Sequence, residues 1–132
     1  MKRFARILNT FMAALLLAAL CAAPASAYSV KQIWARFSAT AGETLVTGDV
    51  VMLKDADGYA YKADANDAAL RPAIGIVGSK GASSGATAEI IVQGILTGWT
   101  ALSEGQPGYV SETAGAVTQS APAYSQQVGQ AI

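Results

Sequence analysis

The sequence contains no histidine, and its only cysteine is Cys21. Without these residues the chain cannot build a Ser-His-Asp or Cys-His nucleophile system, a zinc site of the usual kind, or a haem site with a histidine ligand. A single cysteine also excludes a disulfide within the chain. We therefore predict a protein that is not an enzyme, takes no cofactor and is stabilised by packing.

Charged residues are sparse, at 14% of the chain, and the segment from Met1 to Ala27 carries only basic ones. Three basic residues precede an apolar run over residues 11–23, and the small-residue sequence APASA ends at Ala27. This order is typical of a secretion signal, and the run is shorter than the roughly 20 residues of a membrane-spanning helix. We expect a signal-peptide helix over residues 1–27 and an exported product, periplasmic or extracellular, that begins at Tyr28. Residues 7–23 would contact a membrane only if they stayed uncleaved.

Cleavage would leave six basic residues against nine acidic ones, a net charge of −3, and would remove Cys21. Nucleic-acid binding depends on clustered lysine and arginine, which displace counterions from the phosphates. The negative charge therefore predicts that nucleic acid is not a partner.

After residue 28, apolar residues occur in short runs divided by glycine, aspartate and serine, and no stretch of ten residues has the periodicity of an amphipathic helix. This pattern is typical of many short strands. We predict strands over residues 32–37, 50–54, 59–63, 73–77, 87–93, 95–99, 109–111, 116–118 and 127–132, with one helical turn at most over 64–71. The expected fold is all-β, a compact β-sandwich or barrel in one domain over residues 28–132.

Two segments look like copies of one another at a constant spacing along the chain, LVTGDVVMLKDADGYAYKA (45–63) and LSEGQPGYVSETAGAVTQS (102–120). The identical pairs are Leu45 and Leu102, Gly48 and Gly105, and Gly58 and Gly115. Each copy continues through a polar, proline-containing stretch to a strand with a central glycine, AIGIV or QVGQAI. The shared order predicts an internal duplication with pseudo-repeats near 45–77 and 102–132. The alternative is that short β-strands share such patterns by composition alone.

Alternation along the first hairpin sorts its side chains into two sets, Val51, Leu53 and Ala60 on one face and Met52, Lys54, Tyr59 and Tyr61 on the other. In the second copy, Val110 and Val117 correspond to the first set, and Tyr109 to the second. The face that is apolar in both copies is the expected core. The tyrosines are then expected to point toward solvent or a partner.

Four aspartates lie between Lys54 and Asp67, and Asp55 and Asp57 are weak metal candidates because hard cations take clustered carboxylate oxygens. However, DADG lacks the third oxygen ligand before its glycine and the later bidentate glutamate of an EF-hand loop. An Asp-Gly pair is typical of a hairpin turn. We favour the turn and expect no bound metal.

The glycine-rich stretch GSKGASSG (78–85) resembles a phosphate-binding loop, but no helix follows it, so we expect a loop between strands. Trp34 and Trp99 are the only tryptophans. Trp99 would suit a sugar-stacking platform, although packing in a core or interface is the favoured role for both.

Three stretches carry a resemblance to a known family: AGETLVTGDVVMLKDADGYAYKADANDAALRPAIGIV, GILTGWTALSEGQPGYVSETAGAVTQSAP and VGQAI. Over residues 39–132 the chain resembles β-rich structural modules of tailed phages, which include capsid decoration (cement) and fibre-associated proteins. The resemblance implies a compact β-sandwich or barrel without catalytic residues that binds other virion subunits, often as a trimer. The sequence departs from such modules in its secretion signal and in stopping at VGQAI, where they continue into one more strand.

An exposed sheet edge favours association, so we expect a homo-oligomer, with a trimer as one form. The first function hypothesis is a structural or assembly protein that docks on virion or self subunits through a sheet face and edge. Its expected contact residues are Tyr59, Tyr61, Tyr109 and Trp99. The second hypothesis is a secreted or periplasmic β-sandwich module that binds a glycan or another cell-surface ligand at Trp99.

Overall fold

The computed structural model describes residues 28–99 and 101–132. Its strands are β1 (Ser29–Thr40), β2 (Val50–Leu53), β3 (Ala60–Lys62), β4 (Gly75–Val77), β5 (Thr87–Thr97), β6 (Pro107–Val110), β7 (Val117–Thr118) and β8 (Gln127–Gln130), with one 3₁₀ turn, η2 (Ala68–Leu70). These residues contain no α-helix, and the all-β prediction is confirmed. None of their helical segments has the length and apolar character to cross a membrane. The predicted signal peptide lies outside the described residues.

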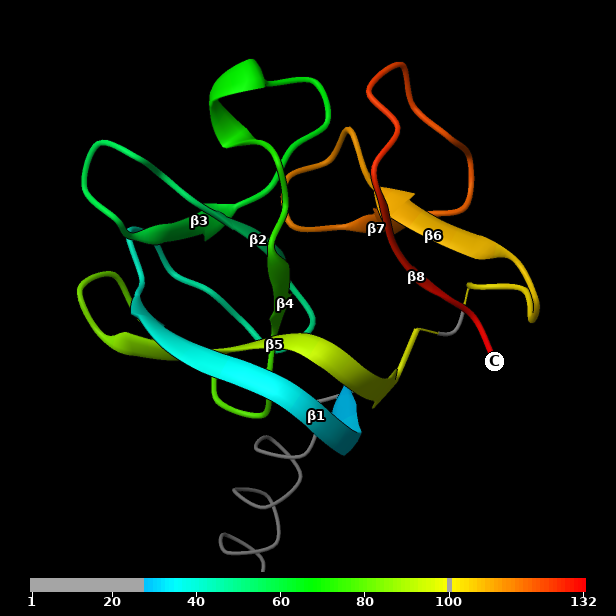
Figure 1. Ribbon diagram of the computed structural model, residues 1–132, viewed down its shortest axis with the longest axis horizontal. Coiled ribbons are helices and arrows are strands. Elements are labelled where there is room, and N and C mark those ends of the chain that lie inside the picture. Colours follow the sequence, from blue (N-terminus) through cyan, green and yellow to red (C-terminus); the bar gives the residue numbers. More distant parts are fainter. Residues whose placement is uncertain (1–27, 100) are drawn as a thin grey trace, which may run out of the picture.

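The strands form two antiparallel sheets, one of five strands in the order β1-β5-β4-β2-β3 and one of three in the order β7-β6-β8. In Figure 1, β1 and β5 run side by side as a long ribbon, and the three-stranded sheet lies on the far side of β2 and β4 from β3. The β1–β5 pairing extends from Ser29 opposite Thr97 to Thr40 opposite Thr87. This ribbon is the longest element of the fold.

The break that we predicted between residues 93 and 95 is wrong, because β5 continues through Gly94 as one strand. A side chain at Gly94 would overlap the carbonyl oxygen of Gln32 in β1. Glycine therefore lets the two backbones approach closely here, next to a register shift between Ile33 and Ala35. Pairing with the long β5 also extends β1 beyond its predicted ends.

The buried side chains form two clusters. The first cluster is made of Ala41, Leu45, Val51, Ala60, Val77, Ala82, Ala88 and Ile90. The second is made of Val50, Met52, Ala63, Ala65, Ala73 and Val110. Alternation along β2 sends Val51 into the first cluster and Val50 and Met52 into the second, so this strand is buried on both faces.

The prediction that Met52 and Tyr61 point away from the core is therefore wrong. Met52 is only 4% exposed, and Tyr61 packs against the second cluster together with Val117 of the smaller sheet. The sequence showed which side chains share a face of the hairpin. It did not show that the second sheet covers that face.

The two predicted pseudo-repeats have the same local structure, and we refer to residues 45–77 as the first unit and residues 102–132 as the second unit. Strand order is β3-β2-β4 in the first unit and β7-β6-β8 in the second. In the hairpins, Met52 pairs with Tyr61 and Leu53 with Ala60, while Tyr109 pairs with Thr118 and Val110 with Val117. Each paired residue of the second hairpin follows its counterpart in the first hairpin at the same spacing that separates Gly58 from Gly115.

The third strands agree as well, at the slightly shorter offset that relates Gly75 to Gly129. Val51 pairs with Gly75 in the first unit, and Gly108 pairs with Gly129 in the second. Matching hydrogen bonds hold the turn before the hairpin in each unit. In the first unit, the Gly48 amide donates to the Val77 carbonyl and the Val77 amide donates to the Asp49 carbonyl. In the second unit, the Gly105 amide donates to the Ala131 carbonyl and the Ala131 amide donates to the Gln106 carbonyl. The two units thus share strand order, register and turn geometry.

Candidate functional site

The DADG stretch forms the hairpin turn between β2 and β3. The Lys54 amide donates to the Tyr59 carbonyl at 3.0 Å, the Gly58 amide donates to the Lys54 carbonyl at 2.7 Å, and Gly58 has a φ of +72°. Asp57 Oδ1 accepts from the Tyr59 amide at 2.9 Å, and Asp57 Oδ2 accepts from the Tyr61 hydroxyl at 2.8 Å. The predicted turn is confirmed, but its loop has four residues rather than two, and only the glycine needs positive φ.

The weak metal candidates, Asp55 and Asp57, do not converge with other ligands. Over residues 28–99 and 101–132, no group of three or more histidine, cysteine, aspartate or glutamate side chains is arranged to hold a metal ion. Both carboxylate oxygens of Asp57 already accept hydrogen bonds within the hairpin. The acidic run therefore has a structural role in this turn.

The contact between Asp57 and Tyr61 changes the pKa of both groups. The pKa of Asp57 lies below its ordinary value because hydrogen bonds stabilise its carboxylate. The Tyr59 amide has the largest effect and the Tyr61 hydroxyl the next, and the positive charge of Lys54 acts in the same direction. The same hydrogen bond stabilises the protonated phenol and raises the pKa of Tyr61. The stabilisation from Asp57 is thus present above the pKa of the unfolded carboxyl and is lost as the pH falls through its folded-state pKa. The stabilisation from Tyr61 is present below the unfolded phenol pKa and is lost as the pH rises through the folded-state pKa.

Replacement of the tyrosine tests this contact. We expect Tyr61→Phe to move the pKa of Asp57 upward toward 3.8, with part of the depression retained because the Tyr59 amide still donates. Carboxylate titration by NMR measures the shift. Tyr59→Phe is the matched control, since it keeps the backbone amide and should leave the Asp57 titration in place. An unchanged Asp57 pKa in Tyr61→Phe would contradict the hydrogen-bonded hairpin.

The predicted contact residues lie in different surroundings. Tyr59 is 42% exposed, in agreement with its expected orientation. Tyr61 is half-buried, with the Lys54 ammonium 5.2 Å from the centre of its ring. Tyr109 is half-buried in β6 between Thr118 and its other neighbour, Gln127.

Of the two tryptophans, Trp34 is 56% exposed on β1, so it does not pack in the core of this chain, and packing in an interface stays a prediction. Trp99, just after β5, is half-buried and contacts Tyr28, with the ring centres 4.8 Å apart and the planes inclined at 47°. This is a favourable geometry for two aromatic rings. The Tyr28 ring in turn lies over Gly48, where an added Cβ would come within 2.7 Å of it. No local pattern around Tyr28 in the sequence indicates this partner.

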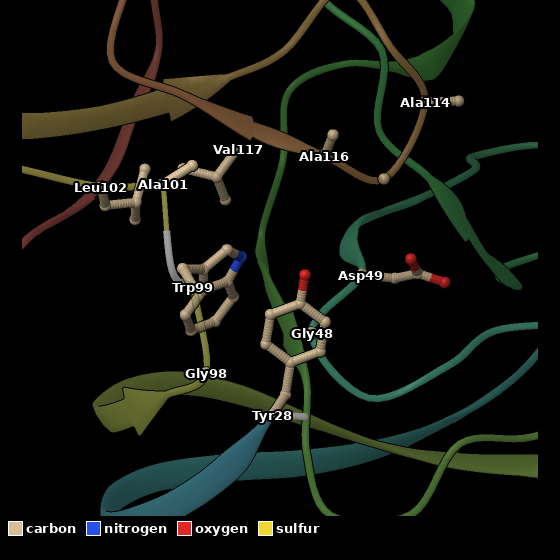
Figure 2. A pocket seen from close by; sticks show the side chains of 11 residues that line it. Tyr28, Gly48, Asp49, Gly98, Trp99, Ala101, Leu102, Ala114, Ala116 and Val117 are labelled. Atoms are coloured by element: carbon tan, nitrogen blue, oxygen red, sulfur yellow. The ribbon is translucent and has the colours of Figure 1, made fainter. Parts of the chain in front are cut away.

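Tyr28 and Trp99 line a cavity of about 340 Å³ between the two units (Figure 2). The remaining lining comes from the turn before β2, the end of β5 and the β6–β7 hairpin: Gly48, Asp49, Gly98, Ala101, Leu102 and residues 114–117. A volume of this size is at the small end for a ligand pocket. Asp49 supplies the carboxylate of the lining.

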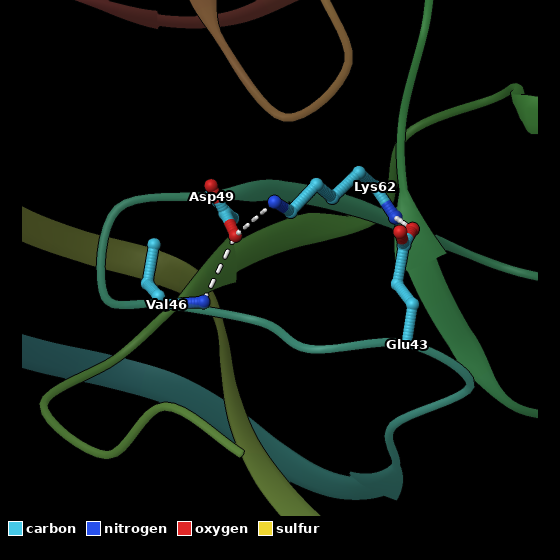
Figure 3. Close-up of polar contacts among 4 residues, drawn as sticks. All are labelled: Glu43, Val46, Asp49 and Lys62. Carbon is cyan, nitrogen blue, oxygen red and sulfur yellow. Dashed lines mark hydrogen bonds and ion pairs between the residues drawn. The ribbon is translucent and has the colours of Figure 1, made fainter. Parts of the chain in front are cut away.

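The Asp49 carboxylate holds the turn that begins the first unit (Figure 3). Its Oδ2 accepts from the Val46 amide at 2.9 Å and lies 3.6 Å from the Lys62 ammonium, and the Lys62 amide donates to Glu43 at 2.7 Å. The Asp49 side chain is only 14% exposed. A carboxylate with these partners stabilises the loop rather than serving as a free acid or base.

The second unit holds its equivalent turn with an amide. Gln119, which corresponds to Lys62, accepts from the Ser103 amide at 2.8 Å and donates to the Ser103 carbonyl at 2.8 Å. Ser103 corresponds to Val46, so the same backbone position is held by an ion-paired carboxylate in one unit and by glutamine in the other. The feature that both units share is the turn, which supports a structural role for Asp49.

The second unit docks on the first through its hairpin turn. The Val50 amide donates to the Gly115 carbonyl at 2.8 Å, and the Gly115 amide donates to the Ala63 carbonyl at 2.9 Å. Gly115 has a φ of +78°, and an added Cβ would come within 2.9 Å of Asp49 and 3.1 Å of Lys62. These bonds close one side of the cavity. The repeated Gly58 and Gly115 were the sequence signal for the two turns, but not for this docking.

Comparisons of the chain with protein-family models, curated proteins and solved structures found no match.

Proposed function

We propose that this protein is a non-enzymatic structural or assembly module, comparable to phage head decoration or fibre modules, that binds virion or self subunits through a sheet edge and face. One observation carries the proposal. In the first unit, β4 pairs along its outer edge with β5, Ile76 opposite Ile91 and Val77 opposite Ile90. Its counterpart β8 pairs only with β6 among the described residues. An edge with free backbone groups favours addition of another strand.

The fold is, in this proposal, a compact β-sandwich that arose by duplication of one three-stranded unit. Matching strand orders, registers and turn hydrogen bonds support the duplication. Packing of Val110 from the smaller sheet with Val50 and Met52 supports the sandwich. The signal-like residues 1–27 would direct the domain to the periplasm or the exterior.

The polar groups of the fold support a structural role rather than catalysis. The carboxylate of the cavity, Asp49, is committed to the Val46 turn and Lys62. On the β1–β5 ribbon, Glu89 lies 2.7 Å from Arg36 in an ion pair between neighbouring strands. These groups hold backbone segments together.

Hydrogen–deuterium exchange at two protein concentrations tests binding through this edge. We expect the β8 amides to exchange more slowly at about 100 µM than at about 1 µM, because association with another copy would cover them. Amides of β2, which is already paired on both sides, provide the internal control. Equal β8 exchange at both concentrations would count against self-association through this strand.

A glycan-binding module is the second candidate function, and the Tyr28–Trp99 pair favours it. Because the rings contact each other, a ligand can stack only on an outer ring face, as a sugar does on an aromatic platform. Trp34→Phe leaves Trp99 as the only tryptophan, so its fluorescence reports on the cavity. With chitotriose and maltotriose as probes, we expect an emission shift in Trp34→Phe and loss of binding in Trp99→Ala. No shift with either sugar would remove the support for this candidate.

A further inference from the structure

We infer that the partner at the β8 edge is a second copy of this chain, bound by antiparallel β8–β8 pairing centred on Gln130. This inference rests on the proposed function and goes further, because it names the partner, the strand and the register. The resulting assembly is a dimer with two-fold symmetry, in which each copy presents the same strand to the other.

The other sheet edges are less suited to strand addition. The outer edge of β1 carries the exposed Lys31 and Arg36, and its pairing with β5 is interrupted by three register shifts, whereas the β6–β8 pairing has one. The outer side of β3 is covered where the Gly42 amide donates to the Ala60 carbonyl. Strand β7 has two residues. Charges, irregular backbone, cover and short length all oppose edge-to-edge pairing.

The repeat identifies which groups of β8 face outward. At the offset that relates Gly75 to Gly129, Gln130 corresponds to Ile76, which pairs with β5. Ile132 corresponds to Gly78, whose amide donates to the Glu89 carbonyl of β5 at 2.9 Å. Ala131 between them bonds inward to the second unit's own turn, as Val77 does in the first unit. The backbone groups of Gln130 and Ile132 are therefore directed toward an added strand, as alternation in an antiparallel ladder requires.

The chemistry of this edge suits a second copy. Residues 113–132 contain no charged side chain, so two such strands meet without like-charge repulsion between side chains. Centring the pair on Gln130 places the two Gln130 side chains opposite each other. Each Gln130 amide already donates to its own Gly105 carbonyl at 3.1 Å and retains an N–H and an oxygen for its counterpart.

The same register also buries apolar surface. Ile132 is 84% exposed, the most exposed of the large hydrophobic residues in the described part of the chain. By residue count, pairing through Gln130 sets Ile132 of one copy opposite Val128 of the other. Val128 lies at the register shift of the β6–β8 pairing and packs against the second buried cluster. The dimer thereby extends that cluster across the two-fold axis and covers an apolar side chain that is otherwise in water.

Site-specific crosslinking tests the register in the full-length chain with Cys21 replaced by serine. In a hydrogen-bonded antiparallel pair, the Cα atoms of opposite residues lie about 5.5 Å apart, within disulfide range. We expect Gln130→Cys to form a covalent dimer under mild oxidation. Ser38→Cys, at an exposed position on the β1 edge, is the matched control and should not crosslink.

A charge variant gives an independent measure. Gln130→Lys is exposed and should fold, but it places two ammonium groups together at the centre of the pair, so we expect self-association about tenfold weaker. Crosslinking of the oligomer through Ser38→Cys, or an oligomer that is unaffected by Gln130→Lys, would overturn the β8–β8 pairing. The proposed function, binding to other subunits, would remain. A chain that stays monomeric would overturn this inference and the self-association part of the proposed function, and would leave binding to virion subunits in place.

Discussion

Ile90→Ala is expected to lower the free energy of unfolding by about 2–5 kcal/mol, the range for truncating a buried isoleucine. Ile90 has no exposed surface and belongs to the first buried cluster. It lies on β5, opposite Phe37 of β1 on one side and Val77 of β4 on the other. Truncation would open a cavity where three strands meet. A domain of this size is usually stable by only about 5–15 kcal/mol, so the loss would be large.

Urea unfolding measures this loss directly. Val92→Ala, two residues further along the same strand, is the matched control because Val92 is 55% exposed. The control should change the stability by about 0.5 kcal/mol or less. Similar losses at the two positions would contradict the burial of Ile90 in the first cluster.

Gly115→Ala is expected to cost about 2–5 kcal/mol, the sum of a backbone and a packing contribution. About 1–2 kcal/mol comes from placing a side chain at positive φ. A further 1–3 kcal/mol, roughly, comes from crowding the methyl group against Asp49 and the Lys62 stem, which lie within 2.9 Å and 3.1 Å of the added Cβ. Either Gly115 moves and loses its hydrogen bonds to Val50 and Ala63, or these neighbours move.

The repeat supplies the matched control. Gly58 occupies the same hairpin position in the first unit with a φ of +72°, but an added Cβ there meets nothing within 4 Å. Gly58→Ala should therefore cost only the backbone term, about 1–2 kcal/mol. The difference between the two variants, measured by urea unfolding, reports the docking of the second unit on the first. Equal losses would contradict that docking.

Much of the fold followed from local signals in the sequence. Glycines at the turns, such as Gly48 and Gly58, mark where β2 begins and where its hairpin closes, because positive φ is costly for other residues. The shared order of turns, strands and proline-containing stretches, together with three identities at one constant spacing, predicted two units, and their hairpins have the same register. Gly94 was misread as a break, since a strand glycine that admits a neighbouring backbone has the same sequence signature as a turn.

The candidate site depended on contacts between distant segments and was only partly predictable. Trp99 was noticed as an aromatic residue at a strand end, but its partner Tyr28 is brought to it by the β1–β5 pairing. The burial of Met52 and Tyr61 depends on the second sheet, which no local pattern places over β2. Alternation assigns side chains to faces, whereas tertiary packing decides which faces meet water.

The mass of the protein in solution is the most direct test of the account, whose central claim is association through the β8 edge. Light scattering from about 1 µM to about 100 µM should show a mass that rises toward twice that of one chain, because dimerisation depends on concentration. The chain of 132 residues has a mass of 13.5 kDa, and removal of the predicted signal peptide would lower both values in proportion. A mass that stays at that of a single chain over the whole range would contradict the account.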